Sequence, residues 1–142
     1  MSRELSFVAH MARAVNGSEL DAIVAVYSED ALLSRVNGGN EEVHRGVAAI
    51  RSAWAGWLRE LDGAEMRKTV TADAGDTVTA EWAAGEAKGV EYWRFDADGL
   101  VYEHRIWGHE AAEPLQNPLD RIRVAAAQAL SRATEGLRRL YP

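Results

Sequence analysis

Apolar residues recur every three or four positions in three segments of the first 61 residues, which is the spacing of helices that bury one face. The first segment covers residues 3–15 and stops at Gly17, a residue that favours the left-handed end of a helix. A second helix is expected to start at Ser18 as its N-cap and to carry Tyr27 at the end of its apolar face. The third covers residues 47–61.

After residue 61 the period of the apolar positions changes from 3.6 to 2, moderately in residues 66–72 and clearly in residues 77–84, which predicts strands. One short strand, residues 31–36, is also expected between the second and third helices. The later strands are expected at residues 66–72, 77–84, 90–95 and 100–107. A tight turn at residues 96–99, which ends in Asp-Gly, predicts that the last two strands form a hairpin. These elements predict an α+β fold in which three helices pack on one face of a strongly curved antiparallel sheet.

The C-terminal part of the chain is predicted to lie outside this unit, which covers residues 1–110. Residues 111–118 contain two prolines and are expected to form a connector. Residues 119–142 have an amphipathic helical pattern with five arginines on the polar face. That helix needs an apolar surface, which its own domain or a sister subunit could supply, while the negative charge elsewhere in the chain disfavours an anionic lipid surface.

Composition narrows the function classes. A chain of 142 residues is sized for one domain, and a net charge of −6 argues against a nucleic-acid-coating protein. The absence of cysteine excludes thiol nucleophiles and disulfides. The polar N-terminus does not have the pattern of a signal peptide, and no apolar run is long enough for a membrane span. We therefore expect a cytoplasmic protein that does not act at a membrane.

Three runs resemble segments of the NTF2-like superfamily, in the right order and at the right spacing. They are residues 17–31 (GSELDAIVAVYSEDA), 45–51 (RGVAAIR) and 91–101 (EYWRFDADGLV). The nearest branch is that of SnoaL-like and ketosteroid-isomerase-like proteins. This resemblance implies a cystatin-like cone with a pocket at its open end, and it implies a homodimer. The extra C-terminal helix lies outside the family core.

The resemblance does not settle the function, because this fold carries isomerases, dehydratases, cyclases and non-catalytic binding domains. On the ketosteroid-isomerase pattern, the catalytic tyrosine falls on Met11 and the aspartate base falls on Arg35. Methionine donates no hydrogen bond and arginine stays protonated, so a steroid isomerase of the usual kind is not expected. The second acid of that pattern falls on Glu91.

Glu91 is the first candidate for a catalytic group. Alternation places Glu91, Trp93 and Phe95 on one face of their strand. A carboxylate among aromatic side chains is unusual on an outer surface, and burial would raise its pKa toward the range of a general acid or base. The alternative is a structural ion pair with Arg35 or Arg105.

His104 is the second candidate. Counting outward from the turn at residues 96–99 places Glu91 directly opposite His104 on the neighbouring strand. A carboxylate and an imidazole in contact can transfer a proton, and the alternative is a structural histidine. Arg35 is the third candidate, as a group that stabilises developing negative charge, and the alternative is a salt bridge with Glu91. Histidine and carboxylate spacings predict no metal site, and no motif indicates a cofactor.

Aromatic and apolar side chains are expected to line a ligand pocket. The predicted lining is Met11, Trp54, Trp82, Trp93, Phe95 and Ile106. Such a pocket suits a small apolar or polycyclic ligand. The sequence therefore supports a cofactor-free isomerase, dehydratase or cyclase, or alternatively a non-catalytic ligand-binding or association domain with a structural Glu/Arg network.

Overall fold

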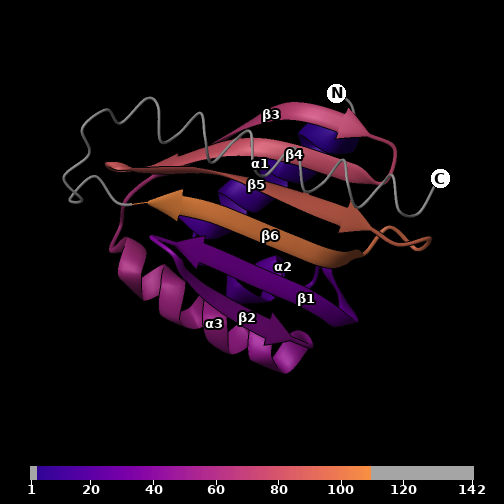
Figure 1. The fold of residues 1–142 in the computed structure, drawn as a ribbon, viewed down its shortest axis with the longest axis horizontal. Helices are drawn as coiled ribbons and strands as arrows, with labels where there is room; N and C mark the ends of the chain where they lie inside the picture. Colours follow the sequence, from indigo (N-terminus) through magenta and orange to yellow (C-terminus); the bar gives the residue numbers. More distant parts are fainter. Residues whose placement is uncertain (1–2, 110–142) are drawn as a thin grey trace.

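The fold is a twisted six-stranded sheet with helices on one face (Figure 1). The computed structural model describes residues 3–109. In chain order the elements are α1 (Arg3–Asn16), α2 (Leu20–Val24), β1 (Tyr27–Asn37), β2 (Asn40–Arg45), α3 (Val47–Leu61), β3 (Met66–Ala74), β4 (Thr77–Ala84), β5 (Ala87–Phe95) and β6 (Val101–His109). The strands lie in the order β2-β1-β6-β5-β4-β3. The α+β prediction is confirmed, and the predicted C-terminal helix, with its connector, lies outside the described residues.

The first and third helices are confirmed, whereas the second is shorter than predicted. Ser18 lies before the N-cap Glu19 with a positive φ of 52°, so it does not cap α2. Tyr27 does not end α2 but opens β1. The reason is strand pairing, because Val101 N donates to Val26 O at 2.8 Å and Tyr27 pairs with Val101. Tertiary pairing therefore overrides a local helical pattern here.

The sheet is mixed rather than antiparallel, and it has one more strand than predicted. β1 runs parallel to β6, while the other neighbouring pairs are antiparallel. The missed strand, β2, pairs with β1 through a turn in which Gly38 and Gly39 have positive φ values. Almost every residue of β2 is exposed, whichever face of the strand its side chain is on. Its sequence therefore has no apolar alternation from which it could be predicted.

The predicted register of the last hairpin is wrong by two residues. Trp93, not Glu91, lies opposite His104, and Glu91 lies opposite Ile106. The shift arises at the turn, where Asp96 N donates to Leu100 O and the register is interrupted next to Phe95. Since a shift of two residues keeps every side chain on its face, Glu91 and His104 remain neighbours, now along a diagonal.

Helices α1 and α2 lie behind the sheet in Figure 1, and α3 packs against β1 and β2. The main core lies between these helices and the inner face of the sheet. A smaller cluster of Val90, Tyr92 and Trp107 lies on the opposite, outer face. Among the described residues, no helix is long and apolar enough to cross a membrane. The site described next occupies the inner face.

Candidate functional site

A cavity of about 340 Å³ opens at one end of the inner face. Three indoles from two elements form much of its wall, namely Trp54 and Trp57 on α3 and Trp82 on β4. Lys68 and Glu91 contribute polar atoms to the same wall. The volume and the aromatic lining suit a small organic molecule with one or two polar groups.

Glu91 is held by two side-chain donors although it is only 1% exposed. Its Oε1 accepts a hydrogen bond from His104 Nε2 at 2.8 Å, and its Oε2 accepts one from Lys68 Nζ at 2.5 Å. The Lys68 side chain is 3% exposed, so the ion pair is almost completely removed from bulk water. A buried carboxylate with both oxygens hydrogen-bonded is held in one orientation.

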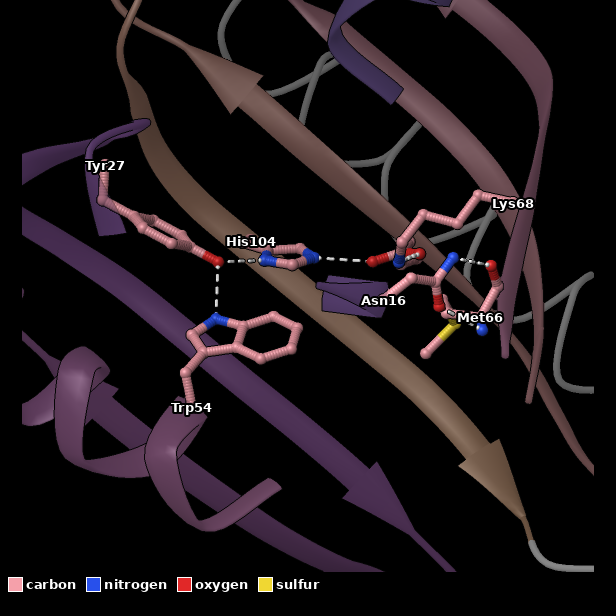
Figure 2. Close-up of polar contacts among 7 residues, drawn as sticks. Asn16, Tyr27, Trp54, Met66, Lys68 and His104 are labelled. Atoms are coloured by element: carbon pink, nitrogen blue, oxygen red, sulfur yellow. Dashed lines mark hydrogen bonds and ion pairs between the residues drawn. The ribbon is translucent and has the colours of Figure 1, made fainter. Parts of the chain in front are cut away.

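A hydrogen-bonded chain extends behind Glu91 through His104 and Tyr27, which do not line the cavity, to Trp54, which does. Figure 2 shows Tyr27 and His104 in a row that runs toward Lys68, with Trp54 meeting the Tyr27 hydroxyl from the side. Tyr27 Oη lies 2.7 Å from His104 Nδ1 and accepts a hydrogen bond from Trp54 Nε1 at 3.0 Å. Because indole nitrogen can only donate, the Tyr27 hydroxyl is free to donate to Nδ1. In this tautomer the ring hydrogen of His104 is on Nε2, which donates the hydrogen bond to Glu91.

The electrostatics agree with this assignment of protons. Burial lowers the pKa of His104, although the Glu91 carboxylate opposes that effect, so His104 is neutral near neutral pH. Burial would raise the pKa of Glu91, but the Lys68 ammonium and the His104 hydrogen bond hold it below its ordinary value. Burial raises the pKa of Tyr27 above its ordinary range. The resting site is therefore an ionised Glu91 beside a neutral imidazole and a neutral phenol.

The predicted lining residues separate into two groups. Trp54, Trp82 and Ile106 line the cavity. Met11, Trp93 and Phe95 are not among the cavity's lining residues. Met11 and Trp93 are fully buried in the core, and Phe95 borders a separate small hollow near the start of α1.

Trp93 nevertheless supports the site from behind. Its ring stacks on the His104 imidazole with a centroid distance of 4.9 Å and an interplanar angle of 24°. Lys68 Nζ lies 5.4 Å from the Trp93 ring centroid, which adds a cation–π contribution. Trp93 therefore holds two members of the polar array without facing the cavity.

Arg35 lines the cavity on its exposed side and does not contact Glu91. Its guanidinium binds Glu42 at 2.7 Å and Glu60 at 3.0 Å, and lies 4.5 Å from the Trp57 ring centroid. The salt bridge between Arg35 and Glu91, considered as an alternative from the sequence, is therefore absent from residues 3–109. Arg105 also has other partners, Glu103 and Glu41.

The Trp82 indole packs over two glycines on the next two strands, β5 and β6. Trp82 pairs with Gly89, and Gly89 pairs with Gly108. A Cβ added to Gly108 would lie 2.3 Å from Trp82 Cζ2, and one added to Gly89 would lie 2.7 Å from the same atom. The two glycines thus leave the space in which the indole lies, and this space fixes the shape of one cavity wall.

Two members of the array were missed from the sequence. Tyr27 was assigned to a helix, so its hydroxyl was not considered. Lys68 shares a strand face with Met66 and Val70, which belong to or pack on the core, and this pattern was a usable signal. Within residues 3–109, no three histidine, aspartate or glutamate side chains gather as a metal site would require.

Residues 8–104 match the SnoaL-like domain family. The chain belongs to this family. No curated protein matches the chain in sequence. The family, with its neighbours among SnoaL-like and ketosteroid-isomerase-like structures, confirms the resemblance drawn from the sequence.

Solved structures with the same fold share little sequence with this chain. A SnoaL-like protein of unknown function from Burkholderia thailandensis is 20% identical, with a TM-score of 0.64 over 79% of this chain and 99% of that one. SalBIII, an epoxide hydrolase/cyclase-like enzyme of pyran ring formation in salinomycin, is 22% identical, with a TM-score of 0.62 over 75% and 90%.

A Mycobacterium tuberculosis protein in complex with estradiol-17beta-hemisuccinate is 13% identical, with a TM-score of 0.55 over 75% of this chain and 93% of that one. At these identities the likeness establishes the fold alone.

Proposed function

We propose that this chain binds an uncharged, largely apolar small molecule in the cavity and that Glu91 exchanges a proton with it. One observation carries this proposal: a buried carboxylate, oriented by two donors, forms part of the wall of an aromatic cavity. Isomerisation, dehydration and cyclisation can each proceed by proton transfer alone, so these are the reactions that the site fits. No cofactor is required for them.

The charges of the lining favour an uncharged ligand. Both cations of the lining are already neutralised, because Lys68 pairs with Glu91 and Arg35 pairs with Glu60. Glu86 adds a further acidic side chain to the lining. An anionic ligand would therefore meet an excess of negative charge, whereas a neutral polycyclic one can pack against the indoles and use a single polar contact.

The roles follow from the contacts. Glu91 accepts the proton, His104 fixes the direction of its carboxylate, and Tyr27 fixes the tautomer of His104. An ammonium has three N–H donors, so Lys68 can also donate to a ligand oxygen. A ligand that draws Lys68 away from Glu91 raises the basicity of the carboxylate, because that hydrogen bond favours the ionised form. In this scheme Lys68 takes the charge-stabilising role that the sequence assigned to Arg35.

Relatives support the proposal by analogy of fold. One neighbour is described as a cyclase-like enzyme and another is complexed with a steroid ester, which agrees with a polycyclic ligand. A homodimer and a cytoplasmic location remain predictions, and sedimentation of the purified chain tests the first.

A specific observation favours the second candidate, a non-catalytic binding domain. The pKa of Glu91 is held below its ordinary value, mainly by the nearby Lys68 ammonium acting against burial. A carboxylate of this kind is a weak base until its partner moves. Ligand binding without chemistry would leave the ion pair intact.

Deuterium uptake by the ligand distinguishes a proton-transfer enzyme from a non-catalytic binding domain. The protein is incubated in deuterated water with a panel of polycyclic ketones and alcohols, binding is followed by quenching of tryptophan fluorescence, and deuterium uptake by the ligand is measured by mass spectrometry. We expect exchange that Glu91→Gln slows by about 10²–10⁴-fold while binding persists. Binding with equal exchange in both proteins supports the binding domain, and a panel that does not bind at all overturns the proposal.

A further inference from the structure

The cation in the cavity wall is a lysine in a chain that otherwise uses arginine. Of the 16 basic residues, Lys68 and Lys88 are the two lysines. Lys88 is exposed on β5, whereas the Lys68 side chain is 3% exposed and lines the cavity. Arginine would bind a carboxylate at least as well, since its guanidinium matches both carboxylate oxygens. What lysine alone offers is a primary amine, which can become a nucleophile.

We propose that the Lys68 amine captures the carbonyl carbon of an aldehyde or ketone and forms a reversible imine in the cavity. The inference rests on the proposed binding of small molecules there, but not on proton exchange between Glu91 and a ligand carbon. Three features support it: the amine lines an apolar cavity, a proton acceptor lies 2.5 Å from Nζ, and aromatic side chains can hold the carbonyl compound in place.

Glu91 supplies the proton transfers that imine formation needs. It takes a proton from the Lys68 ammonium, the freed amine attacks the carbonyl carbon, and a C–N bond forms as the C=O π electrons move to oxygen. That oxygen takes the proton back from Glu91, which gives a carbinolamine. A second proton then passes from nitrogen through Glu91 to the hydroxyl, the C–O bond breaks and water leaves. Overall, an ammonium and a carbonyl give a protonated imine and water, with Glu91 unchanged.

The first of these transfers is helped by the ligand itself. An apolar molecule that fills the cavity displaces water from the space beside the buried ion pair, and a less polar environment favours proton transfer from the ammonium to the carboxylate. His104 and Tyr27 keep the carboxylate in place during the exchange, because both hydrogen bonds lie behind Glu91 and away from the ligand. The same pair therefore rests as ions and reacts as neutral groups.

Reductive trapping tests the proposal on the unmodified chain. The protein is mixed with 2-naphthaldehyde and sodium cyanoborohydride, and adducts are located by peptide mass spectrometry. Lys88 and the α-amino group provide internal references in the same sample. We expect the labelling rate of Lys68 to exceed that of Lys88 by about tenfold or more, because binding places the carbonyl beside the amine. For the same reason the rate at Lys68 should saturate at high aldehyde concentration. Naphthalene, which has no carbonyl group, should protect Lys68 and leave Lys88 unchanged.

Matched variants complete the experiment. Lys68→Arg keeps the charge and should remove the fast adduct, whereas Lys88→Arg should leave it. Labelling of Lys68 no faster than Lys88, in a protein whose tryptophan fluorescence is quenched by naphthalene, overturns the imine and leaves the proposed binding function standing. No quenching and no selective adduct overturn both. Selective labelling of Lys68 without any deuterium exchange into ligands supports the imine alone.

Discussion

Replacing Lys68 with methionine should destabilise the protein strongly, and by an amount that depends on pH. Methionine is close to lysine in length, so it keeps much of the packing while it removes the charge. Glu91 would remain 1% exposed and lose the ammonium that holds its pKa low. Removal of one partner of a buried ion pair costs about 3–5 kcal/mol, against about 0–1 kcal/mol for an exposed pair.

The sign of the pH dependence follows from Glu91. In the natural chain its pKa is lowered, so its contribution to stability is present above the pKa of the unfolded chain and is lost as pH falls through the folded pKa. In the variant, burial is opposed only by the His104 hydrogen bond, so we expect the pKa of Glu91 to rise. A raised carboxyl pKa makes stability fall as pH rises above about 4, the pKa of the unfolded carboxyl. The deficit of the variant should therefore be larger near neutral pH than near pH 4.

Urea denaturation of both proteins, followed by tryptophan fluorescence at the two pH values, measures the deficit. Lys88→Met is the control, because an exposed lysine should change stability by no more than about 0.5 kcal/mol. A deficit below about 1 kcal/mol would show that the pair behaves as a solvated surface pair. A large deficit that is equal at both pH values would attribute the loss to packing and would refute the electrostatic account.

Three further predictions concern the rest of the site. Since burial lowers the pKa of His104, natural-chain stability should decline as pH falls below about 6.5, the pKa of an unfolded histidine, and His104→Gln should abolish that part of the decline in denaturation curves. Tyr27→Phe should cost about 1–3 kcal/mol in the same assay, because it leaves Trp54 Nε1 and His104 Nδ1 without their partner; an unchanged midpoint would contradict the assigned chain. Gly108→Ala should displace the Trp82 indole and weaken quenching by naphthalene, whereas Gly56→Ala on α3 should leave ligand binding unchanged, because its Cβ would make only an ordinary contact of 3.9 Å with the Arg59 side chain.

The predictions were most accurate for elements whose bounds follow from their own apolar periodicity and flanking residues. The third helix, α3, and strand β4 have the bounds predicted for them, because their apolar spacing and their flanking glycines act locally. Glu91 and His104 were found partly for the same reason, since alternation groups Glu91 with two aromatic residues on one face and the predicted hairpin sets His104 beside it. A register error of two residues did not separate them.

Lys68 shows why the rest of the site was not predicted. It lies on β3, and its partner Glu91 lies on β5, with β4 between the two strands. Ala80 of β4 lies directly beside Glu91 and has only a methyl side chain. Which cation reaches a carboxylate across an intervening strand depends on strand order and on the size of the residue between them, and neither property belongs to one segment. Tyr27 was not predicted for a different reason. Its local sequence has a helical pattern, but strand pairing with β6 overrides that pattern.

The proposed ligand accounts for the polar array better than stability does. Buried ion pairs are often replaceable by apolar residues with no loss of stability, so the need for a core does not account for five polar side chains in one connected row. The row is also asymmetric. At one end the Trp54 indole lines the cavity but donates its N–H to the phenol oxygen, while at the other end Glu91 and Lys68 contribute polar atoms to the cavity wall. Each group behind the carboxylate has one donor matched to one acceptor, and this arrangement restrains the carboxylate without consuming the donors of Lys68. The chemistry of the site is therefore concentrated on the two groups that a ligand can reach.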